Sequence, residues 1–380
     1  MKLKVSKDEM LKKLSNIQNI VEKKNTMPIL SHFLLDANKN GSYIVANDLE
    51  MTIKEPIDVT VEEEGKLCVP ARKLFEIVKE MEGDVSFESA GDQWLKLKAG
   101  RSDFKIACLS VNDFPPLPVI GEAEDINIEA DILMEMIEKT LYSAGESDTR
   151  YTLNGLLFHV NPSNLLTVVG TDGHRLAIIS KQIDGGIKSE KKLIVPRKAV
   201  SELRRFLPVT KSEEDKEPEK ITILIGEKNL LFNISPKSPG NRGVQFMTRL
   251  IEGTYPNYEN VVPQANEKKM TIEKDTFAKV LRRMSVISRE RASAVRFDLE
   301  RDNLVVSSSN PDLGESKEEV GVDYKNEKLT VGFNAKYLID ALGAMASEKV
   351  ILELQDPLSP VLVKEEGVEN YTCVIMPMRI

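Results

Sequence analysis

The segment Thr171–Ala177 (TDGHRLA) concentrates residue types that often do chemistry. Asp172 and His174 lie two residues apart with an arginine directly after them, a composition suited to acid/base catalysis or to polar recognition. The flanking segments 165–169 and 176–179 alternate apolar residues, and Asp-Gly favours a hairpin turn, so a strand-turn-strand connection explains the same residues. No nucleophile or partner carboxylate for His174 is identifiable from the sequence. A turn or a binding surface is the better interpretation, and a hydrolase using Asp172 and His174 is kept as an alternative.

Other signatures of catalysis and metal binding are absent from the sequence. It contains no GxxxxGK(S/T), GxGxxG, HExxH or GxSxG motif. The histidines and cysteines have neither the spacing of metal ligands nor a CxxC pair; they are His32, His159, His174, Cys68, Cys108 and Cys373. We expect Cys68 and Cys108, which lie in alternating apolar runs, to be core thiols. The sequence thus predicts no catalytic residue, no metal site and no cofactor.

Length and composition are typical of a globular protein with more than one domain. The chain has 380 residues, of which 41% are hydrophobic and 29% are charged, and its net charge is −8. No apolar run approaches the ~20 residues of a membrane span, and the polar start of the chain does not resemble a signal peptide. We therefore expect a cytoplasmic protein without membrane contact. The negative net charge alone argues against nucleic acid, but it does not say where the charges lie.

The chain contains three copies of one α+β unit. Two patterns each occur three times, and each reads as a short strand followed by an amphipathic helix. The matching stretches are LKVSKDEMLKKLSNI from Leu3, KLCVPARKLFEIV from Lys66, INIEADILMEMIEKT from Ile126, KLIVPRKAVSELR from Lys192, MTIEKDTFAKVLRRM from Met270 and KLTVGFNAKYLIDAL from Lys328. Alternating β-branched runs after the helices, at 42–48, 165–172 and 303–310, predict antiparallel strands.

Three tandem domains follow from this repeat. We place them at residues 1–122, 123–264 and 265–380, because the turn-rich stretches DFPPLPVIGEAED and VVPQANEKK separate the copies. An acidic residue opens the first helix of each copy, where a carboxylate favours the helix N-terminus and is a better cap than a catalytic acid. These residues are Asp8, Asp131 and Asp275.

Basic charge is concentrated on the predicted helices of this acidic chain. We expect helices with net charges of +2, +1, −2, +3, +4 and 0 at residues 7–24, 71–80, 131–145, 197–206, 274–291 and 335–349. They total +8, which leaves −16 for the rest of the chain. A charged outer face is normal for one amphipathic helix, but the same sign on four of six equivalent helices favours a surface that faces a polyanion. Such lysines and arginines suit phosphate backbones, and no helix-turn-helix, zinc finger or RNP motif is present.

Several motifs resemble those of the bacterial DNA polymerase III beta subunit family, the DNA sliding clamps. They are TDGHRLA at 171–177, LIEGTYPNY at 250–258, VIMPMRI at 374–380, LNGLLF from Leu153 and GFNAKY from Gly332. The resemblance covers the whole chain and all three repeats. It implies an α+β clamp fold in a head-to-tail homodimeric ring, with helices lining the hole and antiparallel sheets outside. Such a ring encircles duplex DNA and confers processivity on the replicative polymerase, without catalytic activity or a bound nucleotide.

The resemblance also implies partners and sites. The partners are duplex DNA, a second copy of the chain, the DNA polymerase III alpha subunit and other polymerases, and the delta subunit of an ATP-using clamp loader. Their peptides would enter an apolar cleft between the second and third domains, lined by Leu153, Thr171, Gly173, His174, Arg175, Leu176, Pro256, Val261, Asn334, Tyr337, Val374, Met376, Pro377, Met378 and Arg379. The seams of the ring would bring together Phe104, Ile106, Val286 and Ile287. For contacts with DNA we expect Lys24, Arg72, Lys73, Arg150, Tyr151, Lys198 and Arg205.

Two residues depart from the best-known pattern of that family. Thr152 stands where a tyrosine is expected, and Asn260 stands where an arginine is expected. We therefore expect peptide affinity and gating of the cleft to differ, and Thr152 to weaken a DNA contact to which Arg150 and Tyr151 still contribute. A peptide-binding scaffold that never meets DNA is kept as a further alternative.

Overall fold

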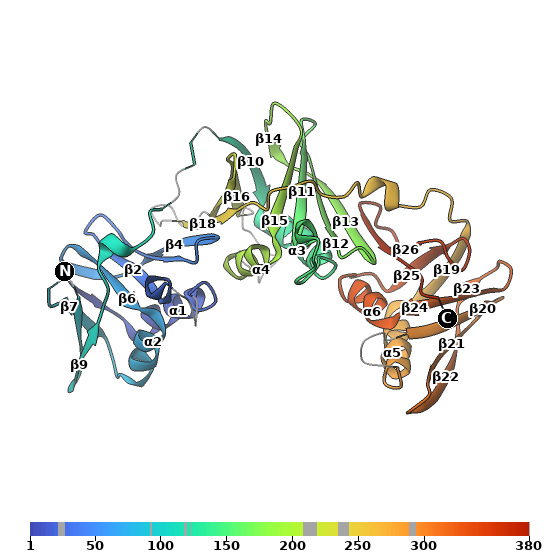
Figure 1. The fold of residues 1–380 in the computed structure, drawn as a ribbon, viewed down its shortest axis with the longest axis horizontal. Helices are drawn as coiled ribbons and strands as arrows, with labels where there is room; N and C mark the ends of the chain where they lie inside the picture. Colours follow the sequence, from blue (N-terminus) through green and yellow to red (C-terminus); the bar gives the residue numbers. More distant parts are fainter. Residues whose placement is uncertain are drawn as a thin grey trace. The chain divides into compact units, whose positions relative to one another are not determined.

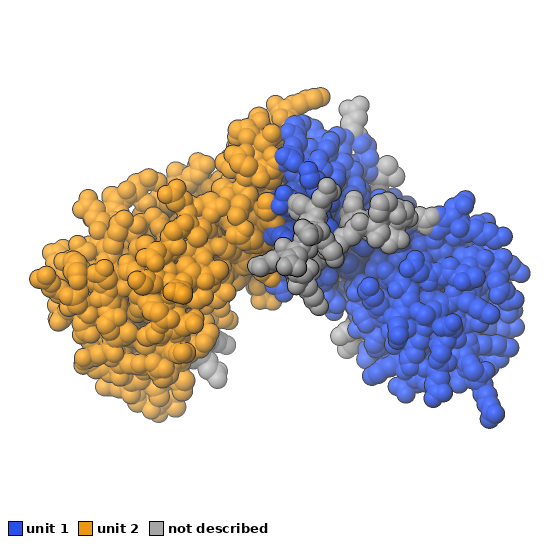
Figure 2. Space-filling view, turned by 180° about the vertical axis from the view of Figure 1, so that it is seen from behind, with its two compact units in different colours: residues 1–131, 184–186, 201–250 blue, residues 132–183, 187–200, 251–380 orange. Residues whose placement is uncertain are grey.

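The computed structural model of the chain is shown as a ribbon in Figure 1, and Figure 2 shows the two compact units that it contains. It describes residues 1–21, 27–91, 93–117, 120–121, 123–207, 219–234, 243–288 and 294–379. The first unit comprises residues 1–131, 184–186 and 201–250, and the second comprises residues 132–183, 187–200 and 251–380. The units therefore divide the middle repeat between them, whereas the three domains expected from the sequence keep it whole.

Within its described residues, the first unit contains two antiparallel sheets. One has the order β5 (Thr60–Glu63), β1 (Lys2–Val5), β7 (Val85–Ser89), β8 (Trp94–Ala99) and β9 (Ser102–Ala107). The other has the order β14 (Asp184–Gly185), β10 (Glu124–Glu129), β16 (Lys220–Ile225), β17 (Asn229–Ile234), β18 (Val244–Arg249), β4 (Met51–Ile57), β3 (Ser42–Asn47), β2 (His32–Ala37) and β6 (Gly65–Pro70).

The described part of the second unit repeats this plan with one long sheet and one short sheet. The long sheet has the order β15 (Lys191–Pro196), β11 (Gly155–Asn161), β12 (Leu165–Thr171), β13 (Arg175–Gln182), β27 (Tyr371–Ile375), β26 (Val361–Glu365), β25 (Lys349–Leu354), β19 (Lys268–Glu273) and β23 (Asp323–Tyr324). The short sheet has the order β22 (Gly314–Gly321), β21 (Asn303–Asn310), β20 (Ala294–Glu300) and β24 (Leu329–Asn334). The antiparallel strands expected at 42–48, 165–172 and 303–310 are confirmed as β3, β12 and β21.

The α-helices of the described chain follow the repeat. They are α1 (Lys7–Ile17), α2 (Ala71–Glu80), α3 (Ala130–Leu141), α4 (Arg197–Phe206), α5 (Lys274–Ser285) and α6 (Ala335–Gly343). α1 and α2 lie side by side in the first unit, as α5 and α6 do in the second (Figure 1). Ser6 caps α1 by accepting the Glu9 N–H at 3.2 Å. The carboxylates of Asp8, Asp131 and Asp275 lie in first turns, which confirms their interpretation as helix-start charges.

Four helices end earlier than the sequence predicts, and this lowers the charge that they carry. The apolar spacing of α1 continues through Ile20 and Val21, but these residues are buried in a turn after the helix. Over the observed bounds, the six helices of the described chain have net charges of +1, +1, −2, +3, +3 and 0. The expected total of +8 is therefore wrong and becomes +6, which still leaves a basic excess on the helices of an acidic chain.

Two lysines of these helices are buried in ion pairs and do not contribute to a basic surface. Lys13 Nζ lies 2.9 Å from Glu55 Oε1 in the first unit. Lys139 Nζ lies 2.5 Å from Glu365 Oε2 in the second unit, and the other Glu365 oxygen accepts the N–H groups of Ala346 at 2.6 Å and Ser347 at 3.1 Å. Burial alone would raise the pKa of Glu365, but the hydrogen bond from Lys139 and the two N–H groups bring that pKa below its usual value.

Replacing Glu365 by alanine is expected to lower the free energy of unfolding by about 3 kcal/mol, because buried Lys139 and two backbone N–H groups lose their acceptor and only Glu135, at 3.4 Å, still pairs with the lysine. Urea denaturation at neutral pH measures the loss, with Glu366→Ala at the exposed neighbouring position as the control. Since the folded-state pKa of Glu365 is depressed, its contribution is present at neutral pH and is lost as the pH falls below the ordinary glutamate range. Equal stability of the two variants would contradict this role.

Neighbouring repeats are joined through the edges of their sheets. β18 pairs with β4 in the first unit, and β27 pairs with β13 in the second, both antiparallel. β9 is equivalent to β18 and β27, because each is the third strand after the second helix of its repeat; β22 is likewise equivalent to β4 and β13 after the first helix. Within the described residues, β9 and β22 are edge strands. The chain therefore makes this strand pairing twice and leaves one strand of each kind without a partner strand on that side.

The described residues show no metal centre. The buried free thiols are Cys68, Cys108 and Cys373, and burial raises the pKa of both the Cys68 and the Cys108 thiol to about 12. No group of three His, Cys, Asp or Glu side chains in the described part of the chain is arranged to hold a metal ion. The helices of the described ranges are all too short or too polar to cross a membrane.

Candidate functional site

The segment 171–177 forms the hairpin between β12 and β13. The Thr171 hydroxyl donates to the Arg175 carbonyl at 2.6 Å, and Asp172 Oδ1 accepts the N–H groups of His174 at 2.9 Å and Arg175 at 3.1 Å. Gly173 occupies the turn with φ +83°, and a Cβ there would meet the Arg150 guanidinium at 2.7 Å. The side chains of this hairpin therefore first hold the turn itself, as the strand-turn-strand interpretation predicted.

An apolar cavity of about 120 Å³ opens beside this hairpin in the second unit. Its lining comes from the 3-10 helix Tyr151–Leu153, the β12–β13 hairpin, the loop 256–261 and the end of β27. The lining residues are Arg150, Leu153, Thr171, Gly173, Arg175, Leu176, Pro256, Tyr258, Val261, Val374 and Met376. Leu176 and Val374 also belong to a buried core cluster, so the floor of the cleft is held by packing from both sheet strands.

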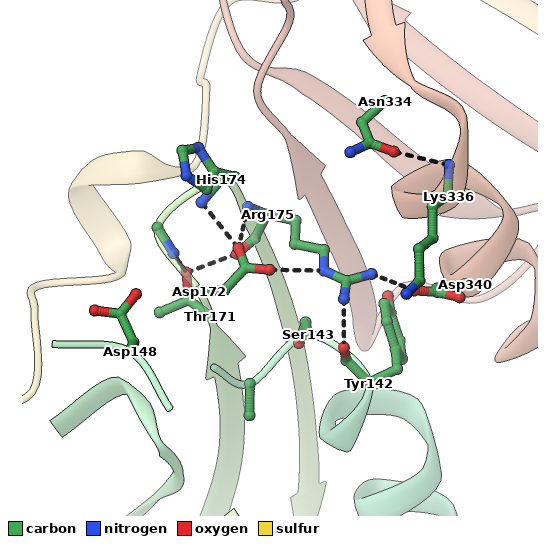
Figure 3. A network of polar contacts seen from close by, with 12 residues as sticks. Tyr142, Ser143, Asp148, Thr171, Asp172, His174, Arg175, Asn334, Lys336 and Asp340 are labelled. Atoms are coloured by element: carbon green, nitrogen blue, oxygen red, sulfur yellow. Dashed lines mark hydrogen bonds and ion pairs between the residues drawn. The ribbon is translucent and has the colours of Figure 1, made fainter. Parts of the chain in front are cut away.

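Arg175 ties the hairpin to α6 through ion pairs (Figure 3). Its guanidinium lies between Asp172 Oδ2 at 3.0 Å and Asp340 Oδ2 at 2.6 Å, and it donates to the Tyr142 carbonyl at 2.7 Å. The Tyr337 ring lies against the same group, 4.6 Å from ring centroid to guanidinium carbon. Burial opposes the charge of Arg175, but the two carboxylates outweigh it and hold its pKa above the usual value. The guanidinium is thus committed to positioning the cleft wall.

This arrangement argues against a hydrolase built on Asp172 and His174. Asp172 accepts two backbone N–H groups and an arginine, so its carboxylate is not directed at the imidazole. The exposed His174 ring instead stacks on Tyr337, with ring centroids 6.4 Å apart and 16° between the planes. The His174 imidazole therefore contacts an aromatic ring and not the Asp172 carboxylate.

Eleven residues line the cavity, and nine of them were expected in the cleft. The remaining cleft residues of the sequence prediction lie outside the cavity lining: His174, Asn334, Tyr337, Pro377, Met378 and Arg379. Asn334 caps α6 by accepting the Lys336 N–H at 2.9 Å, and the Met378 N–H donates to the Gly332 carbonyl at 2.8 Å (Figure 3 shows the Asn334 cap). Their roles at the cleft stay predictions.

Two lining residues, Tyr258 and Arg150, were not predicted at the cleft, and Arg150 was expected at DNA alone. Tyr258 is the last residue of the motif LIEGTYPNY and lies two residues after Pro256, which the same motif supplied to the prediction. Arg150 is held at the cleft by a two-oxygen ion pair with Asp148, at 3.0 and 2.9 Å, and by the Asp172 carbonyl at 3.0 Å. The hydrogen bond from Arg150 lowers the pKa of Asp148 to about 2.

The two departures from the family pattern are not among the lining residues. Thr152 is half-buried in the 3-10 helix between Tyr151 and Leu153, and its methyl group lies 2.9 Å from a Cβ built at Gly253. Gly253 has φ +131°, so no larger residue fits beside this threonine without strain. Asn260 is exposed in the 3-10 helix Glu259–Val261. Each is the direct sequence neighbour of a lining residue, Leu153 and Val261 respectively.

Most residues expected at DNA are exposed on helices. Arg72 and Lys73 of α2 share Glu76, with N–O distances of 3.4 and 2.6 Å. Arg205 of α4 binds Glu202 at 2.9 Å and the Ser15 carbonyl at 3.3 Å. The Tyr151 and Lys198 side chains are also exposed, whereas Lys24 lies outside the described residues.

Of the four residues expected at the seams, Phe104 and Ile106 lie on the unmatched strand β9, and Val286 and Ile287 directly follow α5. Phe104 of β9 is 39% exposed, and Val286, directly after α5, is 75% exposed. Ile106 is buried and Ile287 is half-buried. Phe104 and Val286 are thus the two exposed apolar side chains of this set.

Comparisons with known proteins cover the whole chain. Models of the N-terminal, central and C-terminal domains of the DNA polymerase III beta subunit match residues 1–118, 127–257 and 259–379. The chain is 34% identical to the beta sliding clamp of Caulobacter vibrioides and 30% identical to that of Escherichia coli, each over 100% of both chains. The crystal structure of the Pseudomonas aeruginosa sliding clamp bound to griselimycin superposes with a TM-score of 0.91 at 31% identity, again over 100% of both chains. The chain therefore belongs to the DNA polymerase III beta subunit family, the beta sliding clamps, which are processivity factors and not enzymes.

Proposed function

We propose that this sliding clamp closes head to tail with a second copy into a ring around duplex DNA and holds its polymerase through the apolar cleft. The observation that carries the proposal is the strand pairing that the chain makes twice and leaves unmatched at β9 and β22. Two copies joined at both unmatched edges close a ring with two identical seams. The basic excess on the helices suits a hole filled by DNA.

The two joined edges predict the register of the seams. Lys54 of β4 lies opposite Gln245 of β18, and Ile178 of β13 lies opposite Thr372 of β27. The residue of β22 that is equivalent to Lys54 and Ile178 is found by following residues that pair from strand to strand across each sheet. Each such series of paired residues forms a row. The rows are Cys68–Leu34–Val45–Lys54, Ile194–Leu157–Val169–Ile178 and Gly332–Arg296–Ser307–Lys317. Lys317 is therefore the residue of β22 that corresponds to Lys54 and Ile178.

The first residue of each row also identifies the equivalent residues of β9, β18 and β27, the strands that pair or are proposed to pair with the last strand of a row. The carbonyls of Cys68, Ile194 and Gly332 accept the backbone N–H groups of Leu109, Ile251 and Met378. Six residues before these donors lie Asp103, Gln245 and Thr372. Because the last two face β4 and β13, we expect Asp103 to face Lys317 of the second copy. Two residues along, Lys105 faces Glu315, so both pairs join opposite charges across the seam.

The partners of the cleft are proposed from its chemistry and the family. A cavity with apolar walls, one flexible methionine and a polar rim suits short apolar peptide segments. We assign to it the clamp-binding peptides of the DNA polymerase III alpha subunit, of other polymerases and of the clamp loader delta subunit. We place the protein in the cytoplasm with the replication machinery.

Retention on closed DNA tests the ring. Clamp that its loader has placed on a circular plasmid is expected to stay on the DNA through gel filtration at high salt and to leave when the plasmid is cut once, because a ring is held by topology and not by tight contacts. Loss at the same rate from cut and uncut plasmid would contradict a closed ring.

The basic helices distinguish the clamp from a scaffold that never meets DNA. Arg204 and Arg282 are exposed on α4 and α5 and form no ion pair with another described residue. Replacing both by alanine is expected to lower loading roughly 10-fold at moderate salt, while a double alanine variant at Arg301 and Lys325, outside the helices, changes little. Unchanged loading of the helix variant would favour the scaffold.

A further inference from the structure

His159 is a buried histidine whose two ring nitrogens are both hydrogen bonded. It lies in β11 with 4% of its surface exposed. Nε2 lies 2.5 Å from Glu190 Oε1, and Nδ1 lies 2.8 Å from the Tyr258 hydroxyl. His159 does not line the cleft, but Tyr258 does. The histidine therefore connects an exposed carboxylate to a wall of the cleft.

The carboxylate determines the direction of both hydrogen bonds. Hydrogen bonding from His159, supported by Lys192 at 3.5 Å, lowers the pKa of Glu190, so this group is an ionised acceptor. Nε2 must then carry a hydrogen, and in the tautomer with one N–H this leaves Nδ1 as an acceptor. Burial raises the pKa of Tyr258 to about 12, so its hydroxyl keeps its hydrogen and donates it to Nδ1. The result is one continuous relay from Tyr258 through His159 to Glu190.

Tyr258 forms one wall of the cleft together with other residues of its loop. The loop that carries it also carries Pro256 and Val261, and Tyr258 packs against the core cluster that contains Leu176 and Val374 of the cleft floor. Upstream, the loop is tied down by the Tyr255 hydroxyl, which donates to the Val169 carbonyl at 3.3 Å. The bond to His159 is the corresponding polar tether for the part of the loop that reaches the cavity.

We propose that His159 is a positioning residue of the cleft, which, with Glu190, fixes the Tyr258 wall in the orientation that receives an apolar peptide side chain. The proposal rests on the proposed peptide-binding function of the cleft. Without the relay, the ring and its loop are free to take other orientations, and part of the binding free energy is then needed to order the wall. The loss of one hydrogen bond of this kind corresponds to an affinity about 10-fold lower.

A double-mutant cycle separates positioning from a merely structural role. The probe is a fluorescent synthetic peptide that spans the clamp-binding segment of the cognate DNA polymerase III alpha subunit, titrated with the full-length chain. His159→Leu and Tyr258→Phe are each expected to weaken binding about 10-fold, and the double variant is expected to bind no more weakly than either. His159→Gln, whose amide donates and accepts as the neutral ring does, is expected to recover most of the affinity.

A substitution at an exposed position completes the test. Glu190 is half exposed, so Glu190→Ala leaves the core intact, removes the acceptor that orients the ring and is expected to weaken binding severalfold. Wild-type affinity in folded His159→Leu and in Glu190→Ala, or additive losses in the cycle, would overturn the relay. A wild-type chain that does not bind the peptide would instead overturn the assignment of the cleft, and the relay with it.

Discussion

Replacing Phe104 by aspartate is expected to convert the protein from a dimer into a monomer of 42.6 kDa. Phe104 is 39% exposed on the unmatched strand β9, so the substitution removes little from the core of its own chain. Loss of an aromatic anchor costs about 2 kcal/mol or more at an interface. A ring of two copies contains the position at both seams, so the loss is about 4 kcal/mol, or roughly a thousandfold in the dimer dissociation constant. Light scattering at micromolar concentration measures the mass.

A charge exchange provides the control for the register of the seam. Lys105→Glu and Glu315→Lys are each expected to weaken the dimer, because either change places like charges opposite one another. The combined variant restores opposite charges and is expected to recover the dimer. A Phe104→Asp protein with the mass of a dimer would place the seam elsewhere. If the double variant dimerises no better than the Lys105→Glu and Glu315→Lys single variants, this register is excluded.

Replacing Met376 by aspartate is expected to weaken binding of the polymerase peptide by 100-fold or more. The side chain lines the apolar cavity, and its backbone N–H is held by the His174 carbonyl at 2.9 Å, so the new carboxylate stays in the cavity. Burying an unpaired charge under an apolar ligand costs several kcal/mol, and loss of the thioether also removes contacts. Fluorescence anisotropy with the labelled alpha-subunit peptide measures the change.

Met378→Asp is the matched control for this prediction. Met378 lies two residues further along the same terminal segment, but it is not among the residues that line the cavity. It is therefore expected to weaken binding much less than Met376→Asp. Equal losses would extend the cleft to the end of the chain, as the family resemblance alone suggests, and an unaffected Met376→Asp protein would contradict a peptide site here.

The repeat and the central hairpin were predictable because both depend on local sequence. Alternating apolar residues around Asp-Gly specify β12 and β13 without information from the rest of the chain. The strand-helix pattern recurs three times, so each copy supports the assignment of the others. The third copy also shows the limit of letter matching. Matching KLTV to KLCV makes Thr330 the equivalent of Cys68. The observed strand pairing instead makes Gly332 the equivalent residue, and each of Cys68 and Gly332 lies three residues before a helix, α2 at Ala71 and α6 at Ala335.

Helix ends and long-range partners were not predictable in the same way. Ile20 and Val21 keep the apolar spacing of α1 but are buried in a turn, because tertiary packing and not periodicity ends the helix. From the sequence alone, Lys139 is expected to be a surface charge. Its burial depends on the ion pair with Glu365, which is 226 positions away in the chain. His159 likewise looked like an isolated histidine, since its partners Glu190 and Tyr258 are distant in sequence.

The β18–β4 and β27–β13 pairings within one chain differ from the proposed seams in how readily their strands rejoin after separation. Those junctions connect segments of one polypeptide, so strands that separate there remain at a high effective concentration and rejoin quickly. The proposed seams between β9 of one copy and β22 of the other would have no such covalent connection. When one seam opens, however, the other still links the two copies, and reclosure is a unimolecular step that does not depend on protein concentration. Passage of DNA through one open seam is therefore compatible with a dimer that persists at very low concentration.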